Sequence, residues 1–296
     1  MSKLPKISIV TPSFNQGQFL EQTIISVLGQ CYEHVEYIII DGGSTDDSVD
    51  VIKRYESKLA YWVSEKDNGF AHAINKGMAR ITGDLICWIN SDDYFLPGAF
   101  WKVARTHMSG GLSEVLYYGD CFSFREQGGR AVVNRPPEFD RDLLEVSSYP
   151  VQPSSFWTKS IWDASGGSID EALHFAIDWE FFLRAAKCGR FVKIPEILSG
   201  FRFHQEQKTG LGGNKRREEL LYIVDKNCGA SARACYHFCH DNSSILRSHQ
   251  NLTRRLQGRR VSNAAEIARL AFPKLWKLPE SFTFAQLKAA SHMLLW

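Results

Sequence analysis

Short apolar runs alternate with segments of helical spacing along the first third of the chain. Apolar side chains at Phe19, Leu20, Ile24, Val27 and Leu28 lie on one face of a helix. Runs rich in Ile, Val, Leu and Trp predict strands at residues 7–10, 35–41, 61–64 and 84–89, with helices at 19–28, 48–55 and 70–80. This alternation is typical of βαβ units, so we expect an α/β protein with a mixed, mostly parallel sheet flanked by helices.

The pattern changes after a predicted helix at residues 99–107. Extended runs at 115–124 and 131–133 predict antiparallel additions to the sheet, and residues 152–158 predict another extended segment. A helix is expected from Asp178 to Cys188 and a last strand at 192–203, where Pro195 favours an edge because proline lacks the backbone N–H. Beyond Gln205 the pattern is mainly helical. We therefore expect a first domain at residues 1–208 and a helical C-terminal extension at 209–296.

Polar loops follow each predicted strand of the first half. The carboxyl ends of parallel strands meet at one edge of a sheet, where ligands of open α/β sheets bind. We therefore expect one crevice that contains Thr11, Asn15, Asp41, Ser44, Asp67 and Asp92. Asp92 and Asp93 follow a buried strand, and adjacent carboxylates are ligands for a hard divalent cation. The alternative is that they cap the helix that follows.

Composition and charge exclude several classes. Apolar residues make up 44% of the chain, as in ordinary globular proteins, and the net charge of +2 gives no broad basic surplus for nucleic acid. No segment resembles a signal peptide or a membrane span. Seven cysteines, an odd number, favour reduced thiols over a disulfide framework. We expect a cytoplasmic protein.

Six motifs stand in one order along the chain and resemble the bacterial family-2 nucleotide-sugar glycosyltransferases of the GT-A (Rossmann-like) fold. They lie at residues 7–15, 35–48, 65–77, 88–98, 152–157 and 176–184, within a likeness that covers Lys6 to Lys208. The resemblance implies transfer of a sugar, with inversion, from a nucleoside diphosphate of UDP type to an acceptor hydroxyl. It also implies a role in cell-surface polysaccharide or lipopolysaccharide synthesis, with a glycan or lipid-linked acceptor.

The resemblance assigns a set of residues to the donor. Asp41 would accept the N–H of a uracil-type ring, Phe14 would contact base and ribose, and Gly69 would permit close backbone approach. Lys76 would approach the diphosphate, or is a solvated helix charge. The nucleotide-sugar site is then expected to contain Thr11, Pro12, Phe14, Asn15, Asp41, Ser44, Asp67, Gly69, Asn75 and Asp93.

A divalent cation, Mg²⁺ or Mn²⁺, is implied at Asp92, where it would bridge the diphosphate oxygens and stabilise the leaving group as a Lewis acid. Asp92 lies in an element that resembles the family's D-x-D motif, and the first position of this element is Asn90, which offers only a neutral amide oxygen. Asp93 either compensates for the missing carboxylate or contacts the donor sugar. His204 resembles a metal or diphosphate contact, and the alternative is a structural histidine.

Asp178 matches the general base, because an inverting transfer needs a carboxylate that takes the acceptor proton. Ile177 stands where the family has a first acid, Glu180 is the second choice, and a helix N-cap is the alternative role for Asp178. Trp179 either stacks on an acceptor sugar or packs in the core. Gln152 is a candidate for the acceptor side.

Other activities remain open at this point. A glycoside hydrolase would use two carboxylates but would not need Asp41. A sugar nucleotidyltransferase would need a basic, glycine-rich loop after the first strand, which residues 11–15 lack. A catalytically inactive nucleotide-sugar-binding module is the main alternative, because Asn90 and Ile177 depart from the family pattern.

The C-terminal extension allows two pairs of interpretations. Cys228, Cys235 and Cys239 suggest a zinc site, or buried thiols on one side of a helix, since no recognised ligand spacing is met. Basic residues at 254–260 precede apolar ones at 270–278. This pattern predicts either peripheral contact with the inner face of the plasma membrane or a helix packed on the catalytic domain with its basic side in water.

Overall fold

The computed structural model describes residues 4–125, 128, 131–204, 213–259, 261–276 and 278–295. The chain divides into two compact units. The first contains Met1–Phe139 and Tyr149–Gln207, and the second contains Asp140–Ser148 and Lys208–Trp296. The predicted boundary between residues 208 and 209 lies outside the described residues, and the short segment Asp140–Ser148 joins the second unit.

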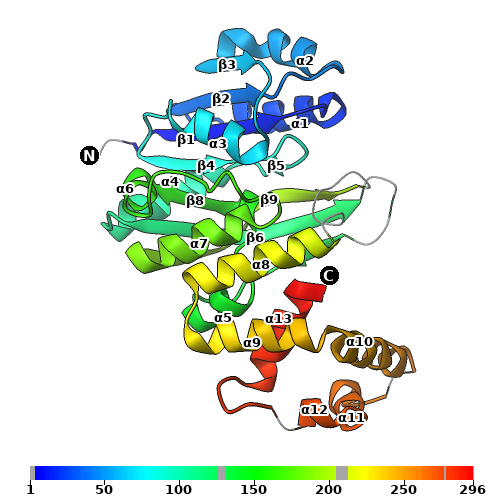
Figure 1. Ribbon diagram of the computed structural model, residues 1–296. Helices are drawn as coiled ribbons and strands as arrows, with labels where there is room; N and C mark the ends of the chain where they lie inside the picture. Colours follow the sequence, from blue (N-terminus) through cyan, green and yellow to red (C-terminus); the bar gives the residue numbers. More distant parts are fainter. Residues whose placement is uncertain are drawn as a thin grey trace. The chain divides into compact units, whose positions relative to one another are not determined.

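The first half of unit 1 is the expected alternation of strands and helices (Figure 1). The strands β1, β2, β3 and β4 are parallel to their neighbours, in the order β3-β2-β1-β4. The elements are β1 (Ile7–Ser13), α1 (Gly17–Leu28), β2 (Val35–Asp41), α2 (Ser48–Tyr55), η1 (Glu56–Lys58), β3 (Tyr61–Ser64), α3 (Phe70–Met78) and β4 (Leu85–Trp88).

The second half of unit 1 extends the sheet to the order β3-β2-β1-β4-β8-β6-β9-β5, with β7 paired to β6. Strands β5, β7 and β8 are antiparallel to their neighbours, whereas β9 is parallel to β6. The elements are β5 (Tyr94–Phe95), α4 (Ala99–Gly110), β6 (Val115–Arg125), β7 (Val132–Asn134), η2 (Gln152–Ser154), β8 (Ser155–Thr158), α6 (Lys159–Ala164), α7 (Ile177–Cys188) and β9 (Arg190–Phe203). The expected mixed, mostly parallel sheet flanked by helices is therefore confirmed.

Pro195 occupies an irregular part of β9. The strand lies between β6 and β5, so it is not the outermost strand of the sheet. The pairing register jumps from Gly119↔Ile194 to Asp120↔Ile197, which leaves Pro195 and Glu196 unpaired in a bulge. Proline is tolerated at such a bulge because no ladder hydrogen bond is needed there. The expected edge position is thus replaced by a bulge.

A cluster of aromatic side chains fixes α7 on the sheet. The ring centroids of Trp88 on β4 and Trp157 on β8 are 5.1 Å apart, and Phe181 of α7 lies 4.8 Å from Trp157. Trp162 of α6 completes the cluster at 5.3 Å from Phe181. Buried aromatic groups of this size dominate core energetics. They hold the first turn of α7, which carries Asp178, in a fixed place on unit 1.

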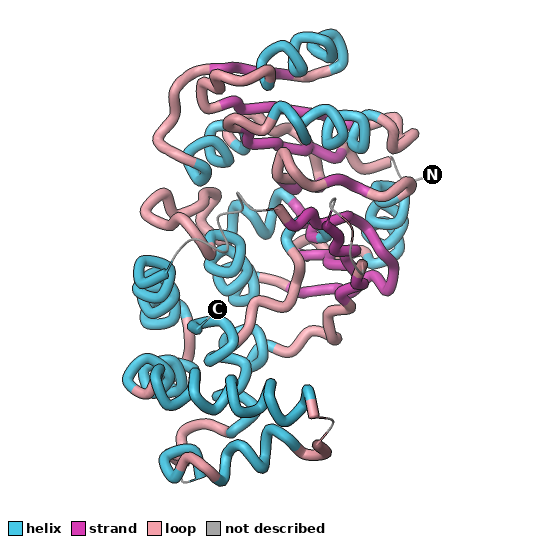
Figure 2. The backbone as a smooth tube through the Cα atoms, turned by 90° about the vertical axis from the view of Figure 1, so that its right-hand side faces the viewer, coloured by secondary structure: helices cyan, strands magenta, loops and turns pink. Residues whose placement is uncertain are grey.

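Unit 2 consists of helices in its described residues, as the sequence predicts for the C-terminal extension (Figure 2). These are α5 (Arg141–Val146), α8 (Gly213–Asn227), α9 (Ala230–Asp241), α10 (Ser243–Gly258), α11 (Ala264–Leu270), α12 (Pro273–Trp276) and α13 (Phe284–Leu295). Its core includes Leu220, Tyr236 and Leu287 together with the thiols of Cys235 and Cys239. Within the described residues, no helix combines the length and apolarity that a membrane span requires.

Candidate functional site

The carboxyl ends of the parallel strands bring the predicted polar loops to one edge of unit 1. The register pairs Ser13 of β1 with Asp41 of β2, and Asp41 with Ser64 of β3. Val10 of β1 pairs with Trp88, the last residue of β4. Because these strands are parallel, the loops that follow them open on the same edge.

Asp41 organises the loop after β2. It is fully buried, and its carboxylate accepts hydrogen bonds from the backbone N–H of Gly43 (3.1 Å) and Ser44 (2.9 Å). The hydroxyls of Ser44 (2.5 Å) and Ser64 (2.6 Å) donate to it as well. A buried carboxylate needs such donors. The four bonds give the loop one conformation, which Gly43 supports with φ +82°.

The loop after β1 is tied to the same structure. The backbone N–H of Asn15 donates to the Ser44 hydroxyl at 2.8 Å, and its side-chain oxygen accepts from the N–H of Thr45 at 2.8 Å. The neighbouring Phe14 is 59% exposed, so its ring is available to a ligand. Thr11, by contrast, is buried and shares a hydrogen bond with the Tyr37 hydroxyl at 3.0 Å. Pro12 is also buried.

The loop after β3 approaches the Asp41 loop closely at a glycine. A Cβ atom on Gly42 would lie 2.8 Å from Oδ2 of Asp67, so any other residue at position 42 would require the Asp67 carboxylate to shift. Oδ1 of Asp67 accepts the N–H of Gly69 at 2.8 Å. Gly69 has φ +112°, a conformation that favours glycine. The carboxylate of Asp67 is therefore fixed beside the loop that Asp41 organises.

Two predicted residues on α3 are engaged within the protein. The side chain of Asn75 donates to Ile169 O (2.9 Å) and Glu171 Oε1 (2.9 Å), and its oxygen accepts from Ile169 N–H (2.7 Å). Lys76 forms an ion pair with Glu65. Asn75 thus anchors the segment between α6 and α7 to α3.

The predicted metal ligands meet although they are far apart in the sequence. Nε2 of His204 lies 2.9 Å from Oδ2 of Asp92, and the two residues are separated by 112 positions. Both side chains are partly accessible, with exposed fractions of 14% and 19%. The ring of Phe19 lies 4.9 Å from the imidazole. A carboxylate oxygen and an imidazole nitrogen therefore occupy one corner of the edge, after β4 and β9.

Asp93 points into the protein. It is 1% exposed, and its carboxylate accepts from the backbone N–H of Arg202 (3.1 Å) and from the Asn90 amide (3.2 Å). Burial, followed by the charge of Asp92, raises the pKa of the Asp93 carboxyl well above its usual value. In this arrangement Asp93 supports the Asp92 loop from behind and presents no oxygen to a sugar.

Arg202 is a buried residue of this corner that the sequence patterns did not indicate. Its Nε donates to the backbone carbonyl of Asp92 at 2.9 Å, and its guanidinium also contacts Gln22. The guanidinium lies 4.6 Å from the ring centroid of Phe19 and 5.1 Å from that of Phe124. An arginine inside the aromatic run Phe201–Arg202–Phe203, directly before His204, is the signal that could have found it.

The side-chain atoms at this corner suit a cation that is also bound by a substrate. Within the described residues no three His, Cys, Asp or Glu side chains form a metal cluster. Magnesium is often held by one or two protein groups together with substrate phosphates and water. The buried Oδ1 of Asn90, two residues before Asp92, has no hydrogen-bond partner within the described part of the chain. The residues present therefore fit a divalent cation completed by diphosphate oxygens.

Asp178 lies in the first turn of α7, where Ala176 is the N-cap residue. Asp178 is therefore not the cap that the alternative interpretation expected. Its Oδ1 accepts the N–H of Trp179 at 2.8 Å, and the residue is partly exposed. Trp179 is fully buried, which agrees with the core-packing alternative rather than stacking on a sugar. Glu180 is 1% exposed and is paired with Arg184 at 2.8 Å. Asp178 is thus the accessible acid of this turn.

Gln152 supports the end of β4. Its amide donates to the backbone carbonyl of Trp88 at 2.7 Å, and the residue is 7% exposed. The side chain thereby fixes the chain just before Asn90. This contact places Gln152 beside the strand end that leads to Asp92.

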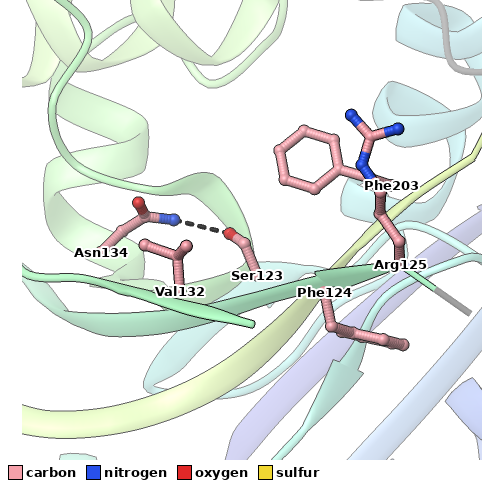
Figure 3. Close-up of a pocket in the computed structure, with 6 residues that line it drawn as sticks. All are labelled: Ser123, Phe124, Arg125, Val132, Asn134 and Phe203. Atoms are coloured by element: carbon pink, nitrogen blue, oxygen red, sulfur yellow. Dashed lines mark hydrogen bonds between the residues drawn. The ribbon is translucent and has the colours of Figure 1, made fainter. Parts of the chain in front are cut away.

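A pocket of about 290 Å³ lies at the carboxyl ends of β6 and β9 (Figure 3). The Arg125 guanidinium lies 5.7 Å from the ring centroid of Phe203 on one side. On the other side, the Asn134 amide donates to the Ser123 hydroxyl at 2.6 Å. The pocket is lined by Ser123, Phe124, Arg125, Val132, Asn134 and Phe203. Phe124 also contacts Arg202, which supports the Asp92 loop.

Solved structures share this fold over nearly the whole chain. TarS 1–349 of S. aureus, in complex with UDP-GlcNAc, matches with a TM-score of 0.64 and 15% identity, covering 98% of this chain and 90% of that one. The mannosyltransferase PcManGT from Pyrobaculum calidifontis, in complex with GDP-Man and Mn²⁺, matches with a TM-score of 0.63 and 16% identity, covering 100% and 88%. At these identities the likeness establishes the fold.

Sequence relatives establish the family. An uncharacterized glycosyltransferase of Mycobacterium tuberculosis is 33% identical over 227 residues, which cover 74% of this chain and 86% of that protein. One from Bacillus subtilis is 29% identical over 230 residues, covering 75% and 84%. The model of glycosyl transferase family 2 matches residues 8–158, from β1 to β8. The protein is therefore a glycosyltransferase that belongs to glycosyl transferase family 2.

Proposed function

We propose that the protein transfers a sugar, with inversion, from a nucleoside-diphosphate sugar to an acceptor hydroxyl in a reaction assisted by a divalent cation. The observation that carries the proposal is the contact between Asp92 and His204, at 2.9 Å, beside the strand-end loops. Membership of glycosyl transferase family 2 supports the reaction class. The solved structures of the same fold that hold UDP-GlcNAc, or GDP-Man with Mn²⁺, support the donor class.

The nucleotide would bind across the loops after β1, β2 and β3. Phe14 offers an exposed ring to the base, and Asp67 offers a fixed carboxylate to base or ribose. Asp41 would act by holding the loop that contains Ser44, since its oxygens already accept four hydrogen bonds. A donor of UDP type remains our first choice. Thr11 and Pro12 would form the floor of this site from buried positions.

The diphosphate would bind at the Asp92 corner. Asp92 and His204, with the amide oxygen of Asn90 as a further group, would hold Mg²⁺ or Mn²⁺ there. When bound, the cation supplies positive charge to the leaving diphosphate. The neutral Asn90 lowers the negative charge of the site relative to a pair of aspartates. Asp93 and Asn75 would shape the site through internal contacts.

Asp178 would accept the proton of the acceptor hydroxyl. A carboxylate general base must be accessible to the acceptor. Glu180 is paired with Arg184, whereas Asp178 is partly exposed at the start of α7. The aromatic cluster around Phe181 gives this turn a rigid support. We therefore assign the base role to Asp178.

The pocket between β6, β7 and β9 would hold a sugar of the acceptor. Aromatic rings bind the apolar face of a sugar, and amide, hydroxyl and guanidinium groups bind its hydroxyls. Phe203, Asn134 and Arg125 provide these groups at the edge that carries the metal corner. We propose a glycan or lipid-linked acceptor and a role in cell-surface polysaccharide or lipopolysaccharide synthesis, in the cytoplasm.

A screen of nucleotide-sugars tests the proposal. The purified protein is incubated with UDP- and GDP-sugars, with Mn²⁺ or with a chelator, and release of the nucleoside diphosphate is measured. Release from one donor that depends on the cation supports a working transferase. Binding of a donor without turnover under any condition would favour the inactive module, which the neutral Asn90 and Ile177 keep as the second candidate.

A further inference from the structure

Charge is strongly segregated along the chain. Residues 243–296 contain nine Lys and Arg but two Asp and Glu, a net charge of +7. The whole chain contains 35 basic and 33 acidic residues, so residues 1–242 contain 26 and 31, a net charge of −5. The small net charge of the protein is therefore the sum of a basic C-terminal segment and an acidic remainder of the chain. Such a basic field attracts anionic partners over about a Debye length, roughly 8 Å at physiological salt.

Helix α10 concentrates this charge on one face. Four arginines of this face are exposed. They are Arg247, Arg254 and Arg255 of the helix and Arg259, which directly follows it. Leu246 and His249 are buried on the opposite side. Within the described part of unit 2, no carboxylate lies within ion-pair distance of these four arginines. We call them the basic face. Because the described residues of the unit give it no acidic partner, it is available to an external anion.

The helix that packs against α10 ends at an exposed apolar side chain. Helix α11 packs against α10 and ends at Leu270, which is 61% exposed. Lys274, one turn further along the chain, is exposed as well. A protein that binds a bilayer surface combines basic residues with exposed apolar ones, which enter the headgroup region. A nucleic-acid site would have no use for an exposed leucine beside its phosphates.

We propose that the basic face of α10, together with Leu270, docks unit 2 on an anionic lipid bilayer. Each Lys or Arg near an anionic leaflet contributes to binding, and four to eight such residues are typical of a lipid-surface site. The interaction is peripheral, in agreement with the absence of a membrane-spanning helix in the described residues. Binding to the bilayer does not require sugar transfer, so the vesicle experiment tests it independently of the proposed function.

Vesicle sedimentation of the full chain tests the proposal. The vesicles contain phosphatidylcholine alone or with phosphatidylglycerol, and the bound fraction is measured at low and physiological salt. The variant R247Q/R254Q/R255Q/R259Q is compared with K53Q/K58Q/R105Q/K187Q, which removes four exposed charges from unit 1. We expect the first to lose about tenfold or more of the affinity for anionic vesicles and the second to keep it.

Several outcomes would overturn the proposal. An equal loss of vesicle affinity in both variants would show an effect of net charge alone. Equally strong binding to vesicles that contain no phosphatidylglycerol would exclude an electrostatic surface. Equal affinity for a DNA oligonucleotide at physiological salt would indicate a general polyanion site. Self-association that disappears in the R247Q/R254Q/R255Q/R259Q variant would assign the face to an acidic second copy.

Leu270→Ser should weaken vesicle binding most at physiological salt, where screening leaves the apolar contribution.

Discussion

The imidazole of His204 and the carboxylate of Asp92 lie 2.9 Å apart, although one follows β9 and the other follows β4. The contact depends on the order of the sheet, because β5 follows Asp93 directly and pairs with β9 at Gly200 and Ser199. A two-residue strand therefore brings two distant chain segments into one corner.

Asp92→Ala should abolish binding of the donor that depends on the cation. The reason is the loss of the Asp92 carboxylate, which is partly accessible, whereas the neighbouring Asp93 is buried. His204→Ala should reduce the affinity for Mn²⁺ by about 10-fold or more, because even residues that only orient metal ligands contribute that much. Calorimetric titration of a nucleoside diphosphate, with and without Mn²⁺, measures both effects. Unchanged affinity in Asp92→Ala would place the cation elsewhere.

Arg202→Lys should impair the same corner indirectly. Lysine keeps the charge but cannot reach the carbonyl of Asp92 and the side chain of Gln22 with a planar guanidinium. We expect a higher requirement for Mn²⁺, with donor binding restored at high Mn²⁺. The matched control is Arg125→Lys, because Arg125 is exposed in the neighbouring pocket. A simple loss of stability, with the Mn²⁺ requirement unchanged, would contradict a positioning role.

The strands and helices of the first half could be predicted because their signals are local. The apolar spacing of residues 19–28 corresponds to α1 (Gly17–Leu28), and the run at 84–89 contains β4 (Leu85–Trp88). The parallel order of these strands follows from the short βαβ connections. The strand-end loops could therefore be placed on one edge from the sequence.

The direction of individual side chains could not be predicted in the same way. Asp92 and Asp93 are adjacent, yet one is accessible and the other buried, because Arg202 and Asn90 hold Asp93 inside. Asn75 bonds to Ile169 across 94 residues. Such choices depend on contacts between distant segments, for which a single sequence contains no periodic signal. The parallel pairing of β9 with β6 escaped prediction for the same reason.

Asp178→Asn should keep donor binding and lose transfer. The amide has the same shape but cannot accept a proton, and a general base contributes roughly 10²- to 10⁴-fold to the rate. Steady-state transfer to the acceptor and titration of the donor are measured on the same preparation. Asp163→Asn, an exposed acid on α6, is the control. Transfer at the wild-type rate in Asp178→Asn would remove the base assignment.

Glu36 on β2 gives the protein a contribution to stability that depends on pH. Burial alone would raise the pKa of its carboxyl, but hydrogen bonds from Lys6, Ser8 and Thr82 outweigh burial and lower it. A folded-state pKa below the unfolded value stabilises the protein above about pH 4.5, and this contribution is lost as the pH falls through the folded pKa.

Glu36→Gln should therefore lower the free energy of unfolding at pH 7 by about 1–3 kcal/mol, the cost of weakening buried hydrogen bonds to a charged group. The variant should also lose less stability than the wild type between pH 5 and pH 3 (roughly the range over which free and hydrogen-bonded carboxyls titrate). Chemical denaturation at a series of pH values measures both. Glu56→Gln, an exposed acid on η1, should change neither quantity. Parallel pH profiles for Glu36→Gln and the wild type would show that Glu36 does not titrate with folding.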